Sequence, residues 1–313
     1  MTLRRLILAV VMLLAAIPAA AQEKRIALTF DDVPRVRGPL FTPDERTRRL
    51  VEQLRRAKVT QAAFFVNPGS LDRPDGVGGE QRIAAYVAAG HVIGDHGFSH
   101  PSLTKIGVAA FLADVDRSEA WLKGRAGFRP WFRFPFLDEG GSDRAVRDAV
   151  RAGLAQRGLS NAYVTVDGSD WNMEDQLRRA VQAGKPVDRR ALRDLYVETM
   201  VRSADFSDAL ARRVLGRSPA HVILLHETDL AALYIADLVK ALRRDGWTIV
   251  TAEAAYRDPL AATAPETPSA QGTRIAMIAL EQGVPSPRSY ERNDTRLANR
   301  LFAARVLHEK EAP

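Results

Sequence analysis

The segment Arg25-Ile26-Ala27-Leu28-Thr29-Phe30-Asp31-Asp32 is an apolar run that ends in two adjacent carboxylates. Its apolar, β-branched and aromatic residues are typical of a buried strand. Six more short apolar runs follow, and segments with a helical period separate them. The seven runs span residues 25–30, 61–66, 91–95, 130–136, 161–166, 221–226 and 247–250.

Helix signals stand between these runs. Thr42-Pro43-Asp44-Glu45 combines an N-cap residue, a proline at the first helical position and a capping acid, so a helix begins there. Two further helical patterns end at Gly90 and Gly246, and glycine commonly follows the last turn of a helix. Regular alternation of strand and helix predicts a parallel α/β sheet, closed into a barrel or doubly wound. Seven units favour a barrel slightly short of eight strands.

The regular alternation stops in two places. Residues 172–218 hold two helical patterns, which we interpret as a helical insertion over one rim of the barrel, in the position of a lid. Residues 258–272 are rich in Ala, Pro and Thr, as linkers are, and residues 273–313 form a basic, partly helical tail. A spacing of four predicts basic residues along one helix face, which is either solvated or binds an acidic polymer. These residues are Arg288, Arg292, Arg296 and Arg300.

The N-terminus has the composition of a secretory signal. Arg4 and Arg5 precede an apolar stretch over residues 6–17, and small residues at 19–21 form a cleavage site. We expect residues 1–21 to be removed, and residues 22–257 to form an exported barrel, periplasmic or secreted. The apolar stretch is too short to span a bilayer comfortably, so we expect no stable membrane anchor after cleavage.

Charge and cysteine content restrict the chemistry. The 45 basic and 38 acidic residues give a formal net charge of +7. This balance fits an acidic cell-envelope polymer at least as well as nucleic acid, and export argues against nucleic acid. The absence of Cys excludes disulfides, thiolate metal ligands and thiol nucleophiles. Any reaction must therefore use His, carboxylates, hydroxyls or Lys.

Polar residues gather at the carboxyl ends of the predicted strands. In a parallel α/β barrel these ends share one rim, where active sites are built. We therefore expect the polar side chains to converge in space. They are Asp31, Asp32, His96, His100, Arg133, Asp167 and His226.

Two of these groups suit metal-dependent hydrolysis. His96 and His100 are four residues apart, which would place both imidazoles on one side of a helical turn, toward one cation. Two imidazoles and one carboxylate from another strand end form the ligand set of a hydrolytic zinc-type site. Adjacent side chains of an extended strand point in opposite directions, so of Asp31 and Asp32 one can bind the metal while the other faces the substrate.

Each feature also has a structural alternative when it is taken alone. The two aspartates could cap a turn, and Arg133 could pair with Asp167 purely for structure. His226 could be a buried core histidine. The occurrence of all these features in order on successive strand ends favours the functional interpretation.

In this combination the chain resembles the polysaccharide deacetylase (NodB-homology) family of metal-dependent carbohydrate esterases. The resemblance extends over residues 25–256 and implies a distorted (β/α)7 barrel, in agreement with the seven strands counted above. Gly97 stands where Ser or Thr is usual in the family. The matching stretches are Thr29-Phe30-Asp31-Asp32-Val33-Pro34, His96-Gly97-Phe98-Ser99-His100-Pro101, Arg133-Phe134-Pro135-Phe136, Asp167-Gly168-Ser169-Asp170-Trp171 and Leu224-Leu225-His226.

The resemblance implies that Asp32, His96 and His100 bind one divalent metal, with zinc first and cobalt or nickel as alternatives. It makes Asp31 the general base and His226 the general acid.

Five further residues receive supporting roles from the resemblance. Asp167 would hold the imidazole of the acid, and Arg133 would hold the carboxylate of the base. The backbone N–H of Phe136 would stabilise the oxyanion, while Trp171 and Leu224 would line a pocket for the acetyl methyl group.

The implied activity is hydrolytic removal of N-acetyl groups from an N-acetylated amino-sugar polymer or oligomer. Two alternatives stay open: hydrolysis of a small non-peptide amide on the same scaffold, and a non-catalytic glycan-binding protein. The sequence alone identifies neither the glycan nor the oligomeric state.

Overall fold

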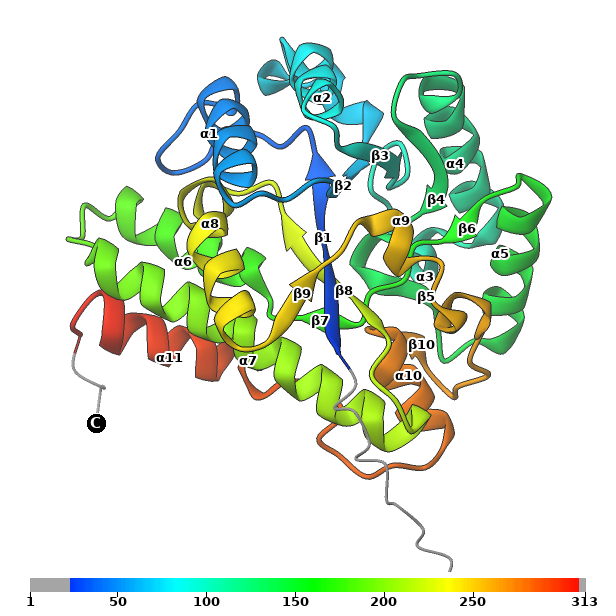
Figure 1. The fold of residues 1–313 in the computed structure, drawn as a ribbon. Coiled ribbons are helices and arrows are strands. Elements are labelled where there is room, and N and C mark those ends of the chain that lie inside the picture. The colour runs from blue at the N-terminus through cyan, green and yellow to red at the C-terminus, as the bar shows by residue number, and fades with distance from the viewer. Residues whose placement is uncertain (1–22, 310–313) are drawn as a thin grey trace, which may run out of the picture.

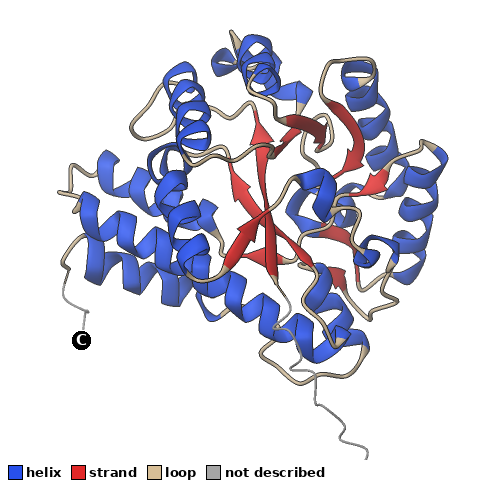
Figure 2. Cartoon of the chain, in the orientation of Figure 1, coloured by secondary structure: helices blue, strands red, loops and turns tan. Residues whose placement is uncertain are grey.

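A parallel sheet forms the centre of the protein, and helices surround it (Figure 1, Figure 2). The computed structural model describes residues 23–309, so the predicted signal segment lies outside the described residues. The strands follow one another across the sheet in the order β6 (Ser160–Asn161), β4 (Phe128–Phe132), β3 (Val92–Asp95), β2 (Ala63–Val66), β1 (Lys24–Val33), β8 (Ala220–His226) and β7 (Val166–Asp167). A further strand, β9 (Trp247–Ile249), pairs with β1 outside this path.

Strand β1 is the centre of this sheet. It pairs in parallel with β8 over seven positions, from Arg25 opposite Ala220 to Asp31 opposite His226. On its other side, the first residues of β1 pair with β9 and the later ones with β2. Its apolar side chains are fully buried, as the run of apolar residues predicts. The pairing places Asp31 and His226 next to each other where the two strands end.

The predicted strand over residues 161–166 is divided in the structure. Its first residue belongs to β6 at one edge of the sheet, and its last belongs to β7 at the other edge. Between them, the N–H of Ala162 donates to the carbonyl of Phe132 and the N–H of Thr165 donates to that of Val222. The segment 162–165 therefore joins the two edges of the sheet. Because it crosses from one edge to the other, this buried apolar run does not form a single strand.

Helices cover the sheet and begin and end where the sequence signals lie. The side chain of Thr42 accepts a hydrogen bond from the N–H of Glu45, as predicted for an N-cap, and Gly90 and Gly246 have positive φ just after their helices. The α-helices are α1 (Pro43–Arg56), α2 (Gly79–Ala88), α3 (Leu103–Ile106), α4 (Val108–Leu122), α5 (Arg144–Gln156), α6 (Asp170–Gln182), α7 (Arg189–Leu215), α8 (Asp229–Arg244), α9 (Ala252–Ala255), α10 (Arg274–Glu281) and α11 (Thr295–Val306). Short 3₁₀ turns lie at Pro68–Asp72, Pro74–Gly76, Pro135–Leu137, Pro259–Ala262 and Glu291–Asn293.

The segment 172–218 is part of the helical layer and does not form a lid. Helix α7 packs against α8, α10 and α11 (Figure 1). Its side chains Leu192, Leu195, Tyr196 and Met200 belong to the main hydrophobic core. A lid would leave such large apolar groups exposed to water, and burying them is more favourable.

The segment after residue 258 is built into the same fold. β10 (Ala270–Gln271) pairs with β5 (Asp138–Gly141), while Phe302 and Val306 of α11 are buried in the main core. The prediction that four arginines share one helix face is wrong, because Arg288 lies outside any helix and Arg292 lies in a 3₁₀ turn. Arg292 is buried and donates to the side chains of Glu198 and Thr199.

The predicted α/β class is confirmed. Seven parallel strands, with β9 as an eighth beside β1, curl into an incomplete barrel that is surrounded by helices (Figure 2). None of the helices within residues 23–309 has the length and apolar character needed to cross a membrane.

Candidate active site

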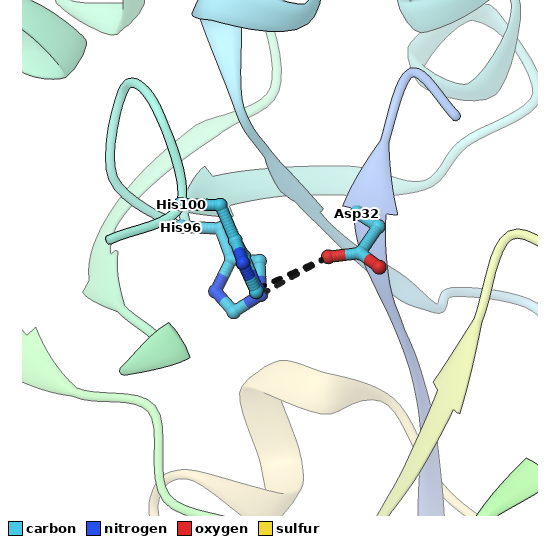
Figure 3. A group of neighbouring side chains, drawn as sticks. All are labelled: Asp32, His96 and His100. Atoms are coloured by element: carbon cyan, nitrogen blue, oxygen red, sulfur yellow. Dashed lines mark ion pairs between the residues drawn. The ribbon is translucent and has the colours of Figure 1, made fainter. Parts of the chain in front are cut away.

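Asp32, His96 and His100 meet at the carboxyl ends of β1 and β3 (Figure 3). One ligand atom from each lies within 4.8 Å of the others. The Oδ1 atom of Asp32 is 3.6 Å from Nε2 of His96 and 3.3 Å from Nε2 of His100. Figure 3 shows the two imidazoles together on one side and the carboxylate opposite them. The three side chains thus surround one point, as the sequence predicts.

The protonation of these side chains suits a cation. Nδ1 of His96 lies 2.7 Å from the carbonyl oxygen of Arg133, which can only accept, so Nδ1 carries a hydrogen and Nε2 is the nitrogen that faces Asp32. Burial and the nearby His96 lower the pKa of His100 to about 4, so this ring is neutral at pH 7. Burial alone would raise the pKa of Asp32, but the neighbouring side chains of His96, His226 and Arg35 hold it well below its usual range. The Nε2 atoms of two imidazoles and an oxygen of a carboxylate therefore face a common point.

The loop that carries the two histidines is not helical, contrary to the expectation of one helical turn. Residues 96–100 form a bend after β3. The amide nitrogen of Asn67 donates to the carbonyls of His96 and Gly97. The carboxylate of Asp114 accepts from the backbone N–H groups of Phe98 and Ser99 and from the hydroxyl of Ser99. These contacts hold the loop without a hydroxyl at position 97.

Asp31 lies beside the candidate metal ligands and is held by an arginine. Nη1 of Arg133 is 2.8 Å from Oδ1 and 3.1 Å from Oδ2 of Asp31, and both side chains are almost completely buried. The other nitrogens of Arg133 donate to the carbonyl of Ala162 and to the hydroxyls of Thr29 and Tyr256. Oδ2 of Asp31 is 3.7 Å from Nε2 of His96. The predicted pair of Asp31 and Arg133 is present and fixes the carboxylate next to the candidate metal position.

Asp170, and not Asp167, holds His226. Nδ1 of His226 is 2.7 Å from Oδ1 of Asp170, whose Oδ2 accepts from the backbone N–H of His226. Asp167 lies on the last residue of β7, and its carboxylate instead accepts from the N–H of Ser169. Asp170 begins α6, and this start of the helix directs its side chain toward the end of β8. The prediction for Asp167 is therefore corrected.

Asp170 also sets the charge of His226. Burial on its own would lower the pKa of this imidazole, but the charge and hydrogen bond of Asp170 outweigh it and raise the pKa to about 9. The ring is therefore protonated at pH 7. Because Nδ1–H is used by Asp170, Nε2–H is the hydrogen that the ring can donate to another group.

Three residues with predicted roles in substrate binding are placed by the fold. The ring of Phe136 contacts the ring of His100 with centroids 4.6 Å apart, and its backbone has a φ of 58°. Trp171 follows Asp170 in α6 and is 38% exposed, while Leu224 on β8 is buried. Their roles toward an acetyl group stay predictions.

Several residues of the site were not found from the sequence. Asp170 was visible in the stretch Asp167-Gly168-Ser169-Asp170-Trp171, where the second carboxylate could have been recognised as the one that starts a helix. Arg35 donates to Oδ2 of Asp32 at 2.9 Å, and no spacing rule connects the two. Tyr256, the residue that follows α9, reaches Arg133 from beyond β9, and only the fold brings the two side chains together.

Known proteins share parts of this sequence. Residues 19–157 match the family described as polysaccharide deacetylase. A peptidoglycan-N-acetylglucosamine deacetylase of Bacillus cereus is 33% identical over 113 residues, which are 36% of this chain and 36% of that protein. A chitin deacetylase of Colletotrichum lindemuthianum is 30% identical over 118 residues, 37% of this chain and 43% of the relative. The matched parts are therefore less than half of each relative.

One solved structure compares over most of the chain. It is a family 4 carbohydrate esterase from Streptomyces lividans in complex with acetate, with 22% sequence identity and a TM-score of 0.48. The comparison covers 75% of this chain and 97% of the esterase.

Proposed function

We propose that this chain removes N-acetyl groups from an N-acetylated amino-sugar polymer or oligomer, because residues 19–157 match the polysaccharide deacetylase family and the similar proteins named above are deacetylases of peptidoglycan and chitin. The observation that carries the proposal is that histidines suited to two different roles meet at the carboxyl end of the sheet. His96 and His100 are ready to bind a cation, whereas His226 is protonated and ready to donate. Asp31 lies between these groups.

The donor set of Asp32, His96 and His100 fits a divalent cation. We propose zinc, with cobalt or nickel as alternatives, because these metals accept imidazole nitrogen together with carboxylate oxygen. Bound there, the cation would polarise the acetyl carbonyl and lower the pKa of the attacking water.

Asp31 acts as general base in this proposal. Arg133 fixes its carboxylate, so the oxygen near His96 can take a proton from water as that water attacks the acetyl carbon. A positioned general base contributes on the order of 10² to 10⁴ in rate. The neighbouring Asp32 differs in that its carboxylate contacts both metal-ligand imidazoles.

His226 acts as general acid. Its Nε2–H donates a proton to the sugar nitrogen while the bond from the acetyl carbon to that nitrogen breaks, which releases acetate and a free amine. Asp170 keeps the ring protonated and fixes its direction. Amide hydrolysis needs this proton because an unprotonated amine leaves poorly. The backbone N–H of Phe136 would stabilise the oxyanion, and Trp171 and Leu224 would contact the acetyl methyl group.

We further propose that the protein acts outside the cytoplasm on a cell-envelope glycan. Two observations support this location. Residues 1–21 have the composition of a secretory signal, and the relatives are named as deacetylases of peptidoglycan and chitin. Sequencing the N-terminus of the exported protein should give Gln22 as its first residue. An intact Met1 would contradict export by cleavage.

Acetate release tests the proposed function. The metal-loaded protein should release acetate from oligomers of N-acetylglucosamine, and His226→Ala should lose most of this activity while it keeps its metal. Release from small amides alone would assign the protein to another hydrolase class on the same scaffold. Binding of the oligomers without any acetate release would identify a glycan-binding protein.

A further inference from the structure

A cavity of about 340 Å³ opens beside the candidate metal site. Asp32 and His100 form one part of its wall, and Arg35, Arg73, Asn67 and Ser70 form much of the rest. Its volume is at the lower end of the roughly 300 to 1,000 Å³ of pockets that hold small organic ligands. Because it shares two metal-ligand residues with the site, a group bound there would lie next to the acetamide that is cleaved.

Arg35 is held rigidly in the wall of this cavity. Its backbone N–H donates to Oε2 of Glu227 at 2.8 Å, and its carbonyl accepts from Nη2 of Arg46 at 2.7 Å. Both partners are buried in the core. The guanidinium of Arg35 donates to Oδ2 of Asp32, the oxygen that does not face the histidines. Two buried charged residues thus fix the backbone from which this guanidinium reaches the cavity.

Arg73 adds a second guanidinium whose charge is not balanced in the cavity. Its side chain is exposed and has no hydrogen-bond or ion-pair partner within residues 23–309. Asp72 precedes it in the chain but does not line the cavity. Of the cavity's other charged side chains, Asp32 is paired with Arg35. The cavity therefore has an excess of positive charge before any cation is bound.

We propose that Arg35 and Arg73 form an anion subsite, so that the preferred substrate is an N-acetylated sugar with a carboxylate or phosphate near its acetamide group. The inference rests on the proposed function, which it makes more specific. The planar guanidinium matches the oxygens of carboxylate and phosphate, and such charge-assisted hydrogen bonds are stronger than neutral ones. A neutral sugar would gain nothing from the unbalanced charge of Arg73.

Two matched pairs of substrates test the subsite. The first is a tetrasaccharide of alternating N-acetylglucosamine and N-acetylmuramic acid, compared with its lactyl methyl esters, which keep the shape and lose the charge. The second is N-acetylglucosamine 6-phosphate compared with N-acetylglucosamine. In at least one pair, the metal-loaded protein should favour the charged member by about tenfold in kcat/KM, as expected for one charge-assisted contact. The pair that responds identifies carboxylate or phosphate as the preferred group.

Arg73→Ala should reduce this preference to about one. Arg37→Ala is the matched control, because Arg37 is an exposed arginine two residues from Arg35 that does not line the cavity. This control should keep the full preference, and added salt should weaken the preference of the wild type. Equal use of both members of both pairs by the wild type, or an unchanged preference in Arg73→Ala, would overturn the subsite.

Failure of the proposed function gives a different result. In that case no probe releases acetate, and the subsite is judged by affinity instead, from the binding of the charged and neutral members of each pair to the wild type and to Arg73→Ala. A charged probe that binds the wild type about tenfold more tightly, with the difference lost in Arg73→Ala, supports an anion site in a protein without this activity. Equal affinities overturn it.

Discussion

At the shared carboxyl end of the sheet, the region around Asp32 and His100 differs from the region around His226 in the protonation of its imidazole. His100 has its pKa lowered to about 4 by burial, whereas His226 has its pKa raised to about 9 in spite of burial. The difference lies in the neighbours, because His226 has a hydrogen bond of 2.7 Å to the buried carboxylate of Asp170, whereas His100 faces a second imidazole and its nearest carboxylate, Asp32, is 3.3 Å away. Histidine can thus serve as a candidate metal ligand in one region of the site and as a candidate proton donor in the other.

Removing a metal ligand should have the largest effect. Asp32→Ala takes away one of three ligand groups, so metal content should collapse and acetate release should fall to background. Asp31→Asn is the matched change on the neighbouring residue, and it should keep the metal while turnover falls on the order of 10² or more.

Metal analysis and the melting temperature must be measured for both variants. Neutralising Asp31 leaves Arg133 without its buried partner, which can cost about 3 kcal/mol of stability or more. Equal metal content in Asp32→Ala and Asp31→Asn would show that the two aspartates do not have the separate roles of metal ligand and general base that we propose.

Removing the proton donor should have the next largest effect. His226→Ala should keep its metal and lose about 10² to 10⁴ in turnover on an N-acetyl sugar. An activated acetate ester should be affected far less, because its leaving group needs no proton. Loss of stoichiometric metal in this variant would show that His226 is itself a metal ligand.

Asp170→Asn should change the pH dependence more than the maximum rate. Without the carboxylate, the pKa of His226 falls from about 9 toward its ordinary 6.5, so the alkaline limit of activity moves to lower pH. Asp167→Asn is the control and should leave that limit in place, because Asp167 does not contact His226. A shift in Asp167→Asn alone would restore the role first predicted for that residue.

The pair of His226 and Asp170 should also make the unfolding free energy of the metal-free protein depend on pH. A raised pKa stabilises the folded state fully below pH 6.5, and this contribution is lost as the pH rises through about 9. The difference in unfolding free energy between the wild type and Asp170→Asn should therefore be widest below pH 6.5 and should narrow toward pH 9. A difference that does not change with pH would show that His226 is not charged in the folded protein.

The smallest expected effect is at the loop that positions the metal ligands. Gly97 has a φ of +74°, and a Cβ there would lie 3.1 Å from the Asp114 oxygen that holds the loop. Gly97→Ala should cost about 1 kcal/mol of stability and weaken metal binding about tenfold. Gly216→Ala, at a φ of +69° with open space around it, should cost similar stability without changing metal affinity. Equal metal affinities in both variants would show that Asp114 does not support the site.

Parallel pairing made most of the site predictable. Once the strands were recognised, their carboxyl ends had to share one edge, and this brought Asp31, Asp32, His96, His100 and His226 together. The choice between Asp167 and Asp170 could not follow from that rule, because it depends on where α6 begins and in which direction its first side chain points.

Two features of the fold differed from what the sequence patterns suggested. An apolar segment that crosses between sheet edges buries its side chains as a strand does, so residues 161–166 looked like one strand. The spacing of four from Arg288 to Arg300 suggested one helix, but Asp294 caps the start of α11 between Arg292 and Arg296, so the first two arginines lie outside that helix.

The central place of β1 has a consequence for the order of folding. This strand lies near the N-terminus, yet its longest ladder is with β8, almost two hundred residues later, and β9 comes later still. Such distant partners raise the entropic cost of closure and slow folding. When the chain emerges with its N-terminus first, the side of β1 that pairs with β8 must therefore stay unpaired until β8 has also emerged. The apolar face of β1 is then exposed to aggregation for most of that time, which gives chaperones a defined interval in which to act.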